Sequence, residues 1–187
     1  MTLSATRTIA VGAGLLLALA VPARAGSYEH TGTAPTKGTA APDHFIKDAA
    51  VGGMSEVELG KLAEQRANRA DVKSFGKRMV NDHSKANDEL KSLAQKKNVS
   101  LPSDVDREHQ AIYDRLSKLS GSDFDNAYMN EMLKDHREDV AEFERASKSP
   151  DPDVQAFASK TLPTLKEHLT QAEQVASSGS ARNTGGR

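Results

Sequence analysis

Residues 79–90 read MVNDHSKANDEL, and residues 132–143 read MLKDHREDVAEF. The two stretches share the pattern Met-x-x-Asp-His, with Glu and a large apolar residue six and seven positions after the histidine. Around the first copy, apolar residues recur at spacings of three and four, the period of an amphipathic helix. His83 lies at the centre of this apolar stripe, and His136 lies on the equivalent stripe of the second copy. The repeat therefore predicts two long helices that each direct a histidine toward the core.

The composition of the 187-residue chain favours helix over sheet. Aromatic residues make up 4%, Trp is absent, and Ala, Lys, Glu, Asp, Leu and Ser dominate. The formal net charge is -1, with both signs interspersed, so the chain lacks the basic surface expected of a nucleic-acid-binding protein. Cys is absent, which excludes disulfides and a lipid-modified N-terminal Cys.

Residues 1–25 have the pattern of a secretory signal peptide. Arg7 supplies the positive charge, residues 9–21 form an apolar run of 13, and residues 23–25 read ARA, which predicts cleavage after Ala25. The run is too short to span a bilayer comfortably, so we expect no transmembrane anchor in the mature chain. These features predict a periplasmic bacterial protein, with secretion as the alternative.

The rest of the chain divides into three predicted parts. Residues 26–42, rich in Gly, Thr, Ala and Pro, form a flexible linker, residues 43–176 form the folded domain, and residues 177–187 form a disordered tail. Periodicity and capping signals predict helices over residues 43–68, 71–97, 104–119, 123–147 and 152–176. Ser103 supplies the capping signal of the third helix, and Pro163 predicts a kink or break in the last.

The four longer helices predict an all-α fold, a ferritin-like four-helix bundle. Each has roughly 25 residues and a length of roughly 37 Å. The link between the second and third long helices contains only a short helix. If this short helix runs along the bundle as a crossover, the chain runs up, down, down and up, with one long connection. A plain up-and-down bundle of five helices is the alternative.

One polar residue interrupts the apolar stripe of each long helix: Glu56, His83, His136 and His168. Counted from the interhelical turns, Glu56 and His83 lie at one level, whereas His136 and His168 differ by about one turn. A kink at Pro163 would absorb part of this difference. Three imidazoles and a carboxylate form a ligand set suited to iron, manganese or zinc, so we predict that these four residues bind a transition metal.

Neighbouring side chains extend this prediction. Asp82 and Asp135 directly precede two of the histidines and are placed to orient ring N–H groups from outside the ligand set. Met79 and Met132 stand one turn before the same histidines, so copper, or a haem held by Met and His, is an alternative that we rank below the other metals. The simplest alternative is a set of hydrogen-bonded core histidines, core-filling methionines and solvated aspartates.

Four separated stretches resemble, in order, the bacterial envelope family known as domain of unknown function (DUF) 4142. They read AAVGGMSEVELG at residues 49–60, MVNDH at 79–83, GSDFDNAY at 121–128 and TLPTLKEHL at 161–169. The resemblance covers about residues 43–176. It implies a ferritin-like bundle and supplies no settled activity.

The sequence departs from a ferritin-like di-iron site in one respect. Such sites place a Glu three residues before a His on two helices. Here the positions three residues before the histidines are Val80, Leu133 and Leu165. We therefore expect a mononuclear or vestigial site rather than a di-iron oxidase.

Three functions follow as hypotheses. The first is a periplasmic ferritin-like protein that binds a transition metal without an established turnover. The second is a non-catalytic envelope stress or interaction module with a metal-free His/Glu core. The third is a metal-dependent oxidase or peroxide-handling enzyme. We rank the enzyme third because it requires an open coordination position and a route for substrate, and neither is visible in the sequence. The sequence also has no nucleophile triad, phosphate-binding loop or Cys-based metal pattern. The sequence identifies no protein partner.

Overall fold

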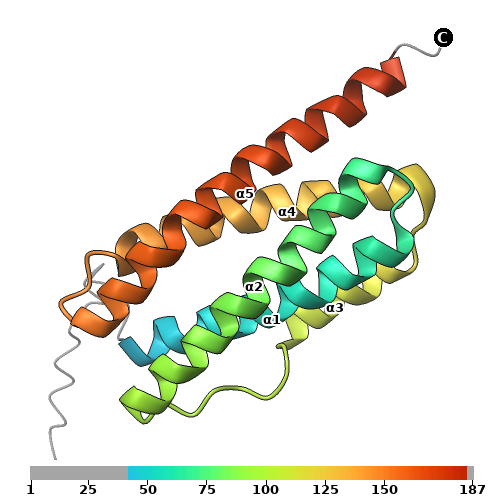
Figure 1. The fold of residues 1–187 in the computed structure, drawn as a ribbon. Helices are drawn as coiled ribbons and strands as arrows, with labels where there is room; N and C mark the ends of the chain where they lie inside the picture. Colours follow the sequence, from blue (N-terminus) through green and yellow to red (C-terminus); the bar gives the residue numbers. More distant parts are fainter. Residues whose placement is uncertain (1–41, 185–187) are drawn as a thin grey trace, which may run out of the picture. The chain divides into compact units, whose positions relative to one another are not determined.

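The computed structural model describes residues 42–184, and the side chains of residues 42–179. It contains the helices α1 (Pro42–Arg66), α2 (Ala70–Lys97), α3 (Arg107–Ser117), α4 (Gly121–Ala146) and α5 (Pro152–Thr184) (Figure 1). The described residues form no strand longer than an isolated bridge. The predicted all-α class is therefore confirmed. The predicted signal peptide (1–25) and all but the last residue of the predicted linker (26–42) lie outside the described residues.

Contacts at the helix ends define the direction of each long helix. In the α1–α2 turn, the backbone N–H groups of Asn68 and Arg69 donate to the Asp125 carboxylate at the start of α4, over 2.9 and 3.0 Å. At the opposite end, Lys97 of α2 forms an ion pair with Asp151, just before α5. Thus α4 starts where α1 ends, and α5 starts where α2 ends. The chain runs up, down, down and up.

The lateral contacts complete the bundle. α1 packs against α2 and α4, and α5 packs against α4 and α2, so the four long helices form a ring around one core. This is the order with a single long connection, rather than an up-and-down array of five helices. The short helix α3 lies in that connection and packs against α1 and α4. Its position was predicted from the sequence.

The N-terminus of α3 differs from the prediction. Its N-cap is Asp106, whose carboxylate accepts hydrogen bonds from two backbone N–H groups of the first turn, each at 3.0 Å. Ser103 instead donates to Asp104 at 2.7 Å and caps nothing. An ionised carboxylate satisfies two free N–H groups at once, so the helix begins three residues later than predicted.

α1 and α2 approach closely at Gly60 and Gly76. A Cβ atom on Gly76 would lie 2.7 Å from the Cβ of Ala63 and 2.8 Å from the carbonyl oxygen of Gly60. Only glycine fits between the two backbones at this crossing. The close approach fixes the α1–α2 hairpin less than two turns before His83.

The helix α5 differs from the prediction at Pro163 and at its C-terminal end. It shows no break at Pro163, one of the two outcomes predicted there, and it continues to Thr184, eight residues beyond the predicted end at Ala176. Arg69, at the start of α2, donates to the Val175 carbonyl and the Ser178 hydroxyl, both at 2.7 Å. This docking holds the helix as far as Ser178, and the predicted disordered tail from residue 177 is wrong over residues 177–184.

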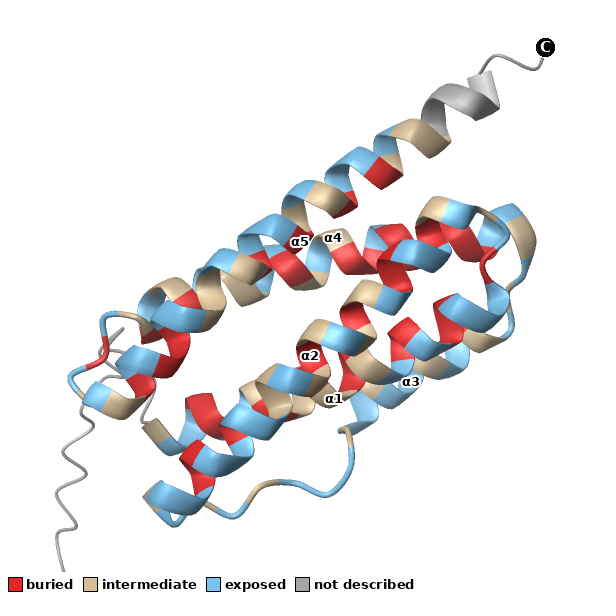
Figure 2. Ribbon diagram, in the orientation of Figure 1, coloured by how far each residue is buried: buried red, intermediate tan, exposed pale blue. Residues whose placement is uncertain are grey.

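The core consists of two apolar clusters separated by polar side chains. One cluster contains Leu59, Phe75, Tyr128 and Ala172, and the other contains Phe45, Leu90, Phe143 and Leu165, each with further apolar neighbours. On all four long helices a buried polar residue lies between the residues of the two clusters. Figure 2 shows the buried residues recurring along each long helix. The polar layer therefore crosses the middle of the core.

Candidate metal centre

The polar layer consists of the four residues that the sequence singled out. Glu56 on α1, His83 on α2, His136 on α4 and His168 on α5 have 1%, 6%, 0% and 1% of their surface exposed. Unpaired polar groups are costly in such a dry position, so each needs a partner or a ligand. The structure brings three of the four together.

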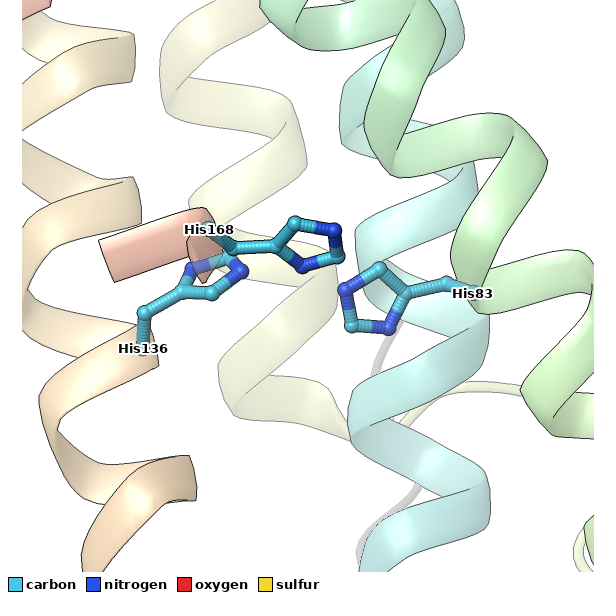
Figure 3. Close-up of side chains that lie close together, drawn as sticks. All are labelled: His83, His136 and His168. Atoms are coloured by element: carbon cyan, nitrogen blue, oxygen red, sulfur yellow. The ribbon is translucent and has the colours of Figure 1, made fainter. Parts of the chain in front are cut away.

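The three histidine rings converge from α2, α4 and α5 (Figure 3). Their centroids lie 5.8 Å apart for His83 and His136, 5.4 Å for His83 and His168, and 5.3 Å for His136 and His168. One ring nitrogen from each residue lies within 4.8 Å of the other two. Nitrogens that far apart can lie about 2.8 Å from a shared centre, against roughly 2.0–2.1 Å for nitrogen bound to zinc. A bound ion would therefore draw each ring inward by less than about 1 Å.

Hydrogen bonds to neighbouring acceptors define which ring nitrogens are available. The His136 Nδ1–H donates to the carbonyl of Met132 at 2.9 Å, because a carbonyl can only accept. The His168 Nε2–H donates to the Asp82 carboxylate at 3.0 Å. The opposite nitrogens, Nε2 of His136 and Nδ1 of His168, are buried and without a partner, as is Nε2 of His83. In the first two rings the unpaired nitrogen carries a lone pair.

A network at the edge of the bundle supports His168. Arg78 donates to Asp82 at 3.2 Å, to Glu167 at 2.7 Å and to Gln171 at 2.9 Å. Partial burial opposes ionisation of Asp82, but hydrogen bonds from His168 and Arg78 outweigh it, and the pKa of this carboxyl is lowered. An ionised Asp82 keeps the proton of His168 on Nε2, which leaves Nδ1 free. Carboxylate–histidine pairs of this kind accompany most histidine metal ligands.

Burial keeps the three imidazoles neutral. It lowers the pKa of His136 to about 4, with a further contribution from His168. It lowers the pKa of His83 well below its usual range, assisted by the other two rings, and it lowers the pKa of His168 against the opposing hydrogen bond to Asp82. Metal coordination requires neutral imidazole, so these rings are in the binding form at neutral pH.

Glu56 occupies a different place from the one predicted. Its Oε1 lies 3.6 Å from Nδ1 of His136, the nitrogen that bonds the Met132 carbonyl, and it is not among the mutually close ligand atoms. Neither carboxyl oxygen has a hydrogen-bond partner. Burial, followed by the charges of Asp135, Asp139 and Glu131, raises the pKa of Glu56 well above its usual range. Glu56 therefore lies beside Nδ1 of His136 rather than beside the unpaired Nε2.

The other predicted residues take separate places. Asp135 is half-buried, and the hydrogen bonds of His136 do not include it. Met79 and Met132 are buried members of the apolar cluster around Phe75. His109, in α3, bonds Asp106 and is not among the three clustered histidines.

Sequence reasoning missed two residues near the site. Arg78 stands four residues before Asp82, a spacing that places both on one helix face and could have revealed the pair. Asp139 lines a small cavity together with His83. Its position three residues after His136 was the available signal, because residues three apart on a helix are neighbours.

The chain matches the domain of unknown function DUF4142 over residues 28–175, so it belongs to this family. The match confirms the family resemblance found in the separated motifs. No curated protein matches the chain.

Solved structures share the fold at low sequence identity. A DUF305 fragment from Deinococcus radiodurans is 14% identical, covers 73% of this chain and 95% of its own, and has a TM-score of 0.65. A DUF305 protein from Streptomyces coelicolor, described as a candidate secreted protein, is 13% identical over 75% and 93%, with a TM-score of 0.65. CopM in its Cu(II)-bound form is 15% identical over 73% and 96%, with a TM-score of 0.62. The likeness establishes a shared helical-bundle fold.

Within the part of the chain that the structure describes, no helix combines the length and apolar character needed to cross a membrane.

Proposed function

We propose that this protein binds one copper or zinc ion at His83, His136 and His168 inside the helical bundle. The observation that carries the proposal is the set of three buried, unpaired ring nitrogens, one from each of three helices, within reach of one another. Hydrogen bonds on the far side of two rings orient their lone pairs. In a metal-free core these nitrogens leave three polar atoms unsatisfied, and a bound ion removes that cost.

The donor set favours copper and zinc over the other predicted metals. Three neutral imidazoles suit copper and zinc, whereas manganese prefers carboxylate and water ligands. No carboxylate lies among the close ligand atoms. Affinities of nitrogen sites rise to Cu(II) and fall at Zn(II), so we expect Cu(II) to bind more tightly than Zn(II). CopM, a protein of similar fold, has been solved with Cu(II) and with Ag, which supports moving copper above its predicted rank.

We infer that Asp82 serves as the outer carboxylate that orients His168, and that Glu56 supports His136 rather than binding the ion. Asp82 contacts its histidine directly, whereas Glu56 faces the nitrogen that points to the Met132 carbonyl. Asp135 has no such contact and is left out of the proposed site.

We further propose that the protein works in the bacterial periplasm. The family match begins at residue 28, just after the predicted cleavage position at Ala25. This agrees with removal of the leader and retention of the whole domain. Identification of the mature N-terminus of protein purified from a periplasmic extract tests this. A mature chain that still begins at Met1 would contradict it.

Metal titration tests the proposed centre. Metal-stripped protein is titrated with Zn(II) and Cu(II) by calorimetry, and bound metal is measured by elemental analysis after desalting. We expect one ion per chain, and we expect His83→Ala, His136→Ala and His168→Ala each to weaken binding at least 100-fold. His44→Ala is the matched control, because His44 is exposed on α1 and pairs with Asp48.

Circular dichroism confirms that each variant retains its helix content. One ion per chain with unchanged affinity in folded His83→Ala and His168→Ala would refute the centre. The hypotheses of a metal-free interaction module and of an oxidase or peroxide-handling enzyme stay predictions. The unpaired ring nitrogens favour metal binding over the first, and the proposal requires no turnover.

A further inference from the structure

A small cavity adjoins the three-histidine cluster. It has a volume of about 30 Å³ and is lined by residues from all four long helices. Its polar wall includes His83, whose Nε2 atom has no partner, and Asp139 of α4. Its α1 wall contains Gly52 and Gly53. A space of this size holds about one water molecule or a partly dehydrated ion.

Asp139 belongs to an acidic strip on the face of α4 that turns toward α1. Asp135, Asp139 and Glu142 recur at spacings of four and three, so they share one helix face. None of the three forms an ion pair with a Lys or Arg among residues 42–179. Glu142 reaches a separate depression at the surface, which it lines together with Asp48 of α1. Glu142 lines the surface depression, as does Arg145, and Asp139, three residues before Glu142 on α4, lines the cavity beside His83.

Burial and neighbouring carboxylates disfavour a negative charge on Asp139, and a bound cation would compensate that charge. Asp139 is half-buried. Burial, followed by the charges of Asp135, Glu142 and Glu138, raises the pKa of Asp139 to about 8. A cation that arrives at this carboxylate replaces its proton and relieves the repulsion within the strip.

We propose that this cavity is the entry site of the metal ion, and that the Asp139 carboxylate binds the incoming divalent cation before His83 takes it into the three-histidine cluster. The proposal rests on the proposed function and adds a path to it. The ion exchanges water first for a carboxylate oxygen and then for imidazole nitrogens, one ligand at a time. Asp139 does not belong to the final ligand set, because it is absent from the mutually close ligand atoms.

Binding kinetics test the path. Zn(II) association with purified, metal-stripped protein is followed by stopped-flow competition with a chromophoric chelator, and the dissociation constant is measured separately at equilibrium. We expect Asp139→Asn to slow association and dissociation about tenfold or more, while the dissociation constant changes less than threefold. A group used only in transit lowers the barrier in both directions.

Glu138→Gln serves as the matched control. It removes a neighbouring carboxylate that is 66% exposed and pairs with Lys134 at the surface. This variant should bind Zn(II) at nearly the wild-type rate. Equal effects of Glu138→Gln and Asp139→Asn would reduce the result to general surface charge and overturn the proposal.

The remaining outcomes are also decisive. A wild-type association rate in Asp139→Asn would show that the ion enters elsewhere, while the centre itself stands. Faster dissociation with an unchanged association rate in Asp139→Asn would make Asp139 a ligand of the bound ion, which contradicts a transit role. Absence of any Zn(II) or Cu(II) binding by the wild-type protein would overturn the proposed function first, and the path with it.

Discussion

Replacing Asp139 by Asn should stabilise the metal-free protein at pH 8 and leave it almost unchanged at pH 4. The folded protein holds the pKa of Asp139 at about 8, against an ordinary value of 3.8. Below pH 3.8 both states carry the proton and the group contributes nothing. As the pH rises from 3.8 to 8, the unfolded chain ionises freely while the folded chain does not, so stability falls across this window. An Asn side chain does not titrate and avoids this loss.

The structure sets the size of this effect. The difference of about 4.2 pKa units between 3.8 and 8 corresponds to about 5.7 kcal/mol at 1.36 kcal/mol per unit. Asp139 is only partly buried, so solvent screening reduces the expected gain to roughly 2–3 kcal/mol at pH 8. For a domain of this size that gain raises the melting temperature by roughly 5–10 °C.

The assay is thermal or urea unfolding followed by circular dichroism, in buffers that contain a chelator, at pH 4, 6 and 8. The gain should grow with pH. Glu138→Gln, on the exposed side of α4, should stay within about 0.5 kcal/mol of wild type at all three pH values. A melting temperature of Asp139→Asn equal to or below that of wild type at pH 8 would refute the reasoning, because it would mean that this carboxylate is already well solvated or paired.

Three further results are expected. Asp82→Asn should weaken metal binding roughly 10–100-fold by removing the carboxylate that orients His168. Glu138→Gln, tested by the same titration, removes an exposed carboxylate that pairs with Lys134 and should leave the affinity within about threefold; equal losses would contradict the orienting role. Zn(II) at 100 times its dissociation constant should stabilise the protein by about 2.7 kcal/mol, and an unchanged melting temperature in differential scanning calorimetry would contradict binding to the folded state. Gly76→Ala should cost roughly 1–3 kcal/mol in urea unfolding, because its Cβ would press on Ala63; wild-type stability would show that α1 and α2 can separate freely.

The level of the polar layer could be predicted because helix geometry alone determines it. A helix rises 1.5 Å per residue, so counting from the interhelical turns places Glu56, His83, His136 and His168 near one height. The one-turn mismatch expected for His168 did not prevent the rings from meeting at 5.3–5.8 Å between centroids. The α5 helix passes through Pro163 without a break, so His168 reaches the other two rings from a continuous helix.

The composition of the centre could not be predicted in the same way. Counting along helices resolves about one turn, or 5.4 Å, which exceeds the size of a metal's coordination shell. Glu56 was therefore predicted to be a ligand. Its carboxyl instead lies beside Nδ1 of His136, the nitrogen that bonds the Met132 carbonyl. Asp82 was predicted to orient a histidine because it directly precedes His83. The histidine that it bonds is His168, on another helix. Only tertiary packing reveals that pairing.

The local errors have two physical causes. At α3 two capping residues, Ser103 and Asp106, competed within one short segment, and the ionised side chain prevailed. At the end of α5 the polar composition favoured a disordered tail, but Arg69 from α2 holds that turn by bonds to Val175 and Ser178. Long-range contacts decide helix ends where local preference is weak.

The most direct test of the three-histidine centre is the crystal structure of the Cu(II)- or Zn(II)-loaded protein, with anomalous diffraction measured at the absorption edge of the metal. We expect one strong peak in the bundle core, roughly 2.0–2.2 Å from Nε2 of His83, Nε2 of His136 and Nδ1 of His168. A core without a peak, with metal only at surface sites such as His44 and Asp48, would contradict a metal centre in this bundle.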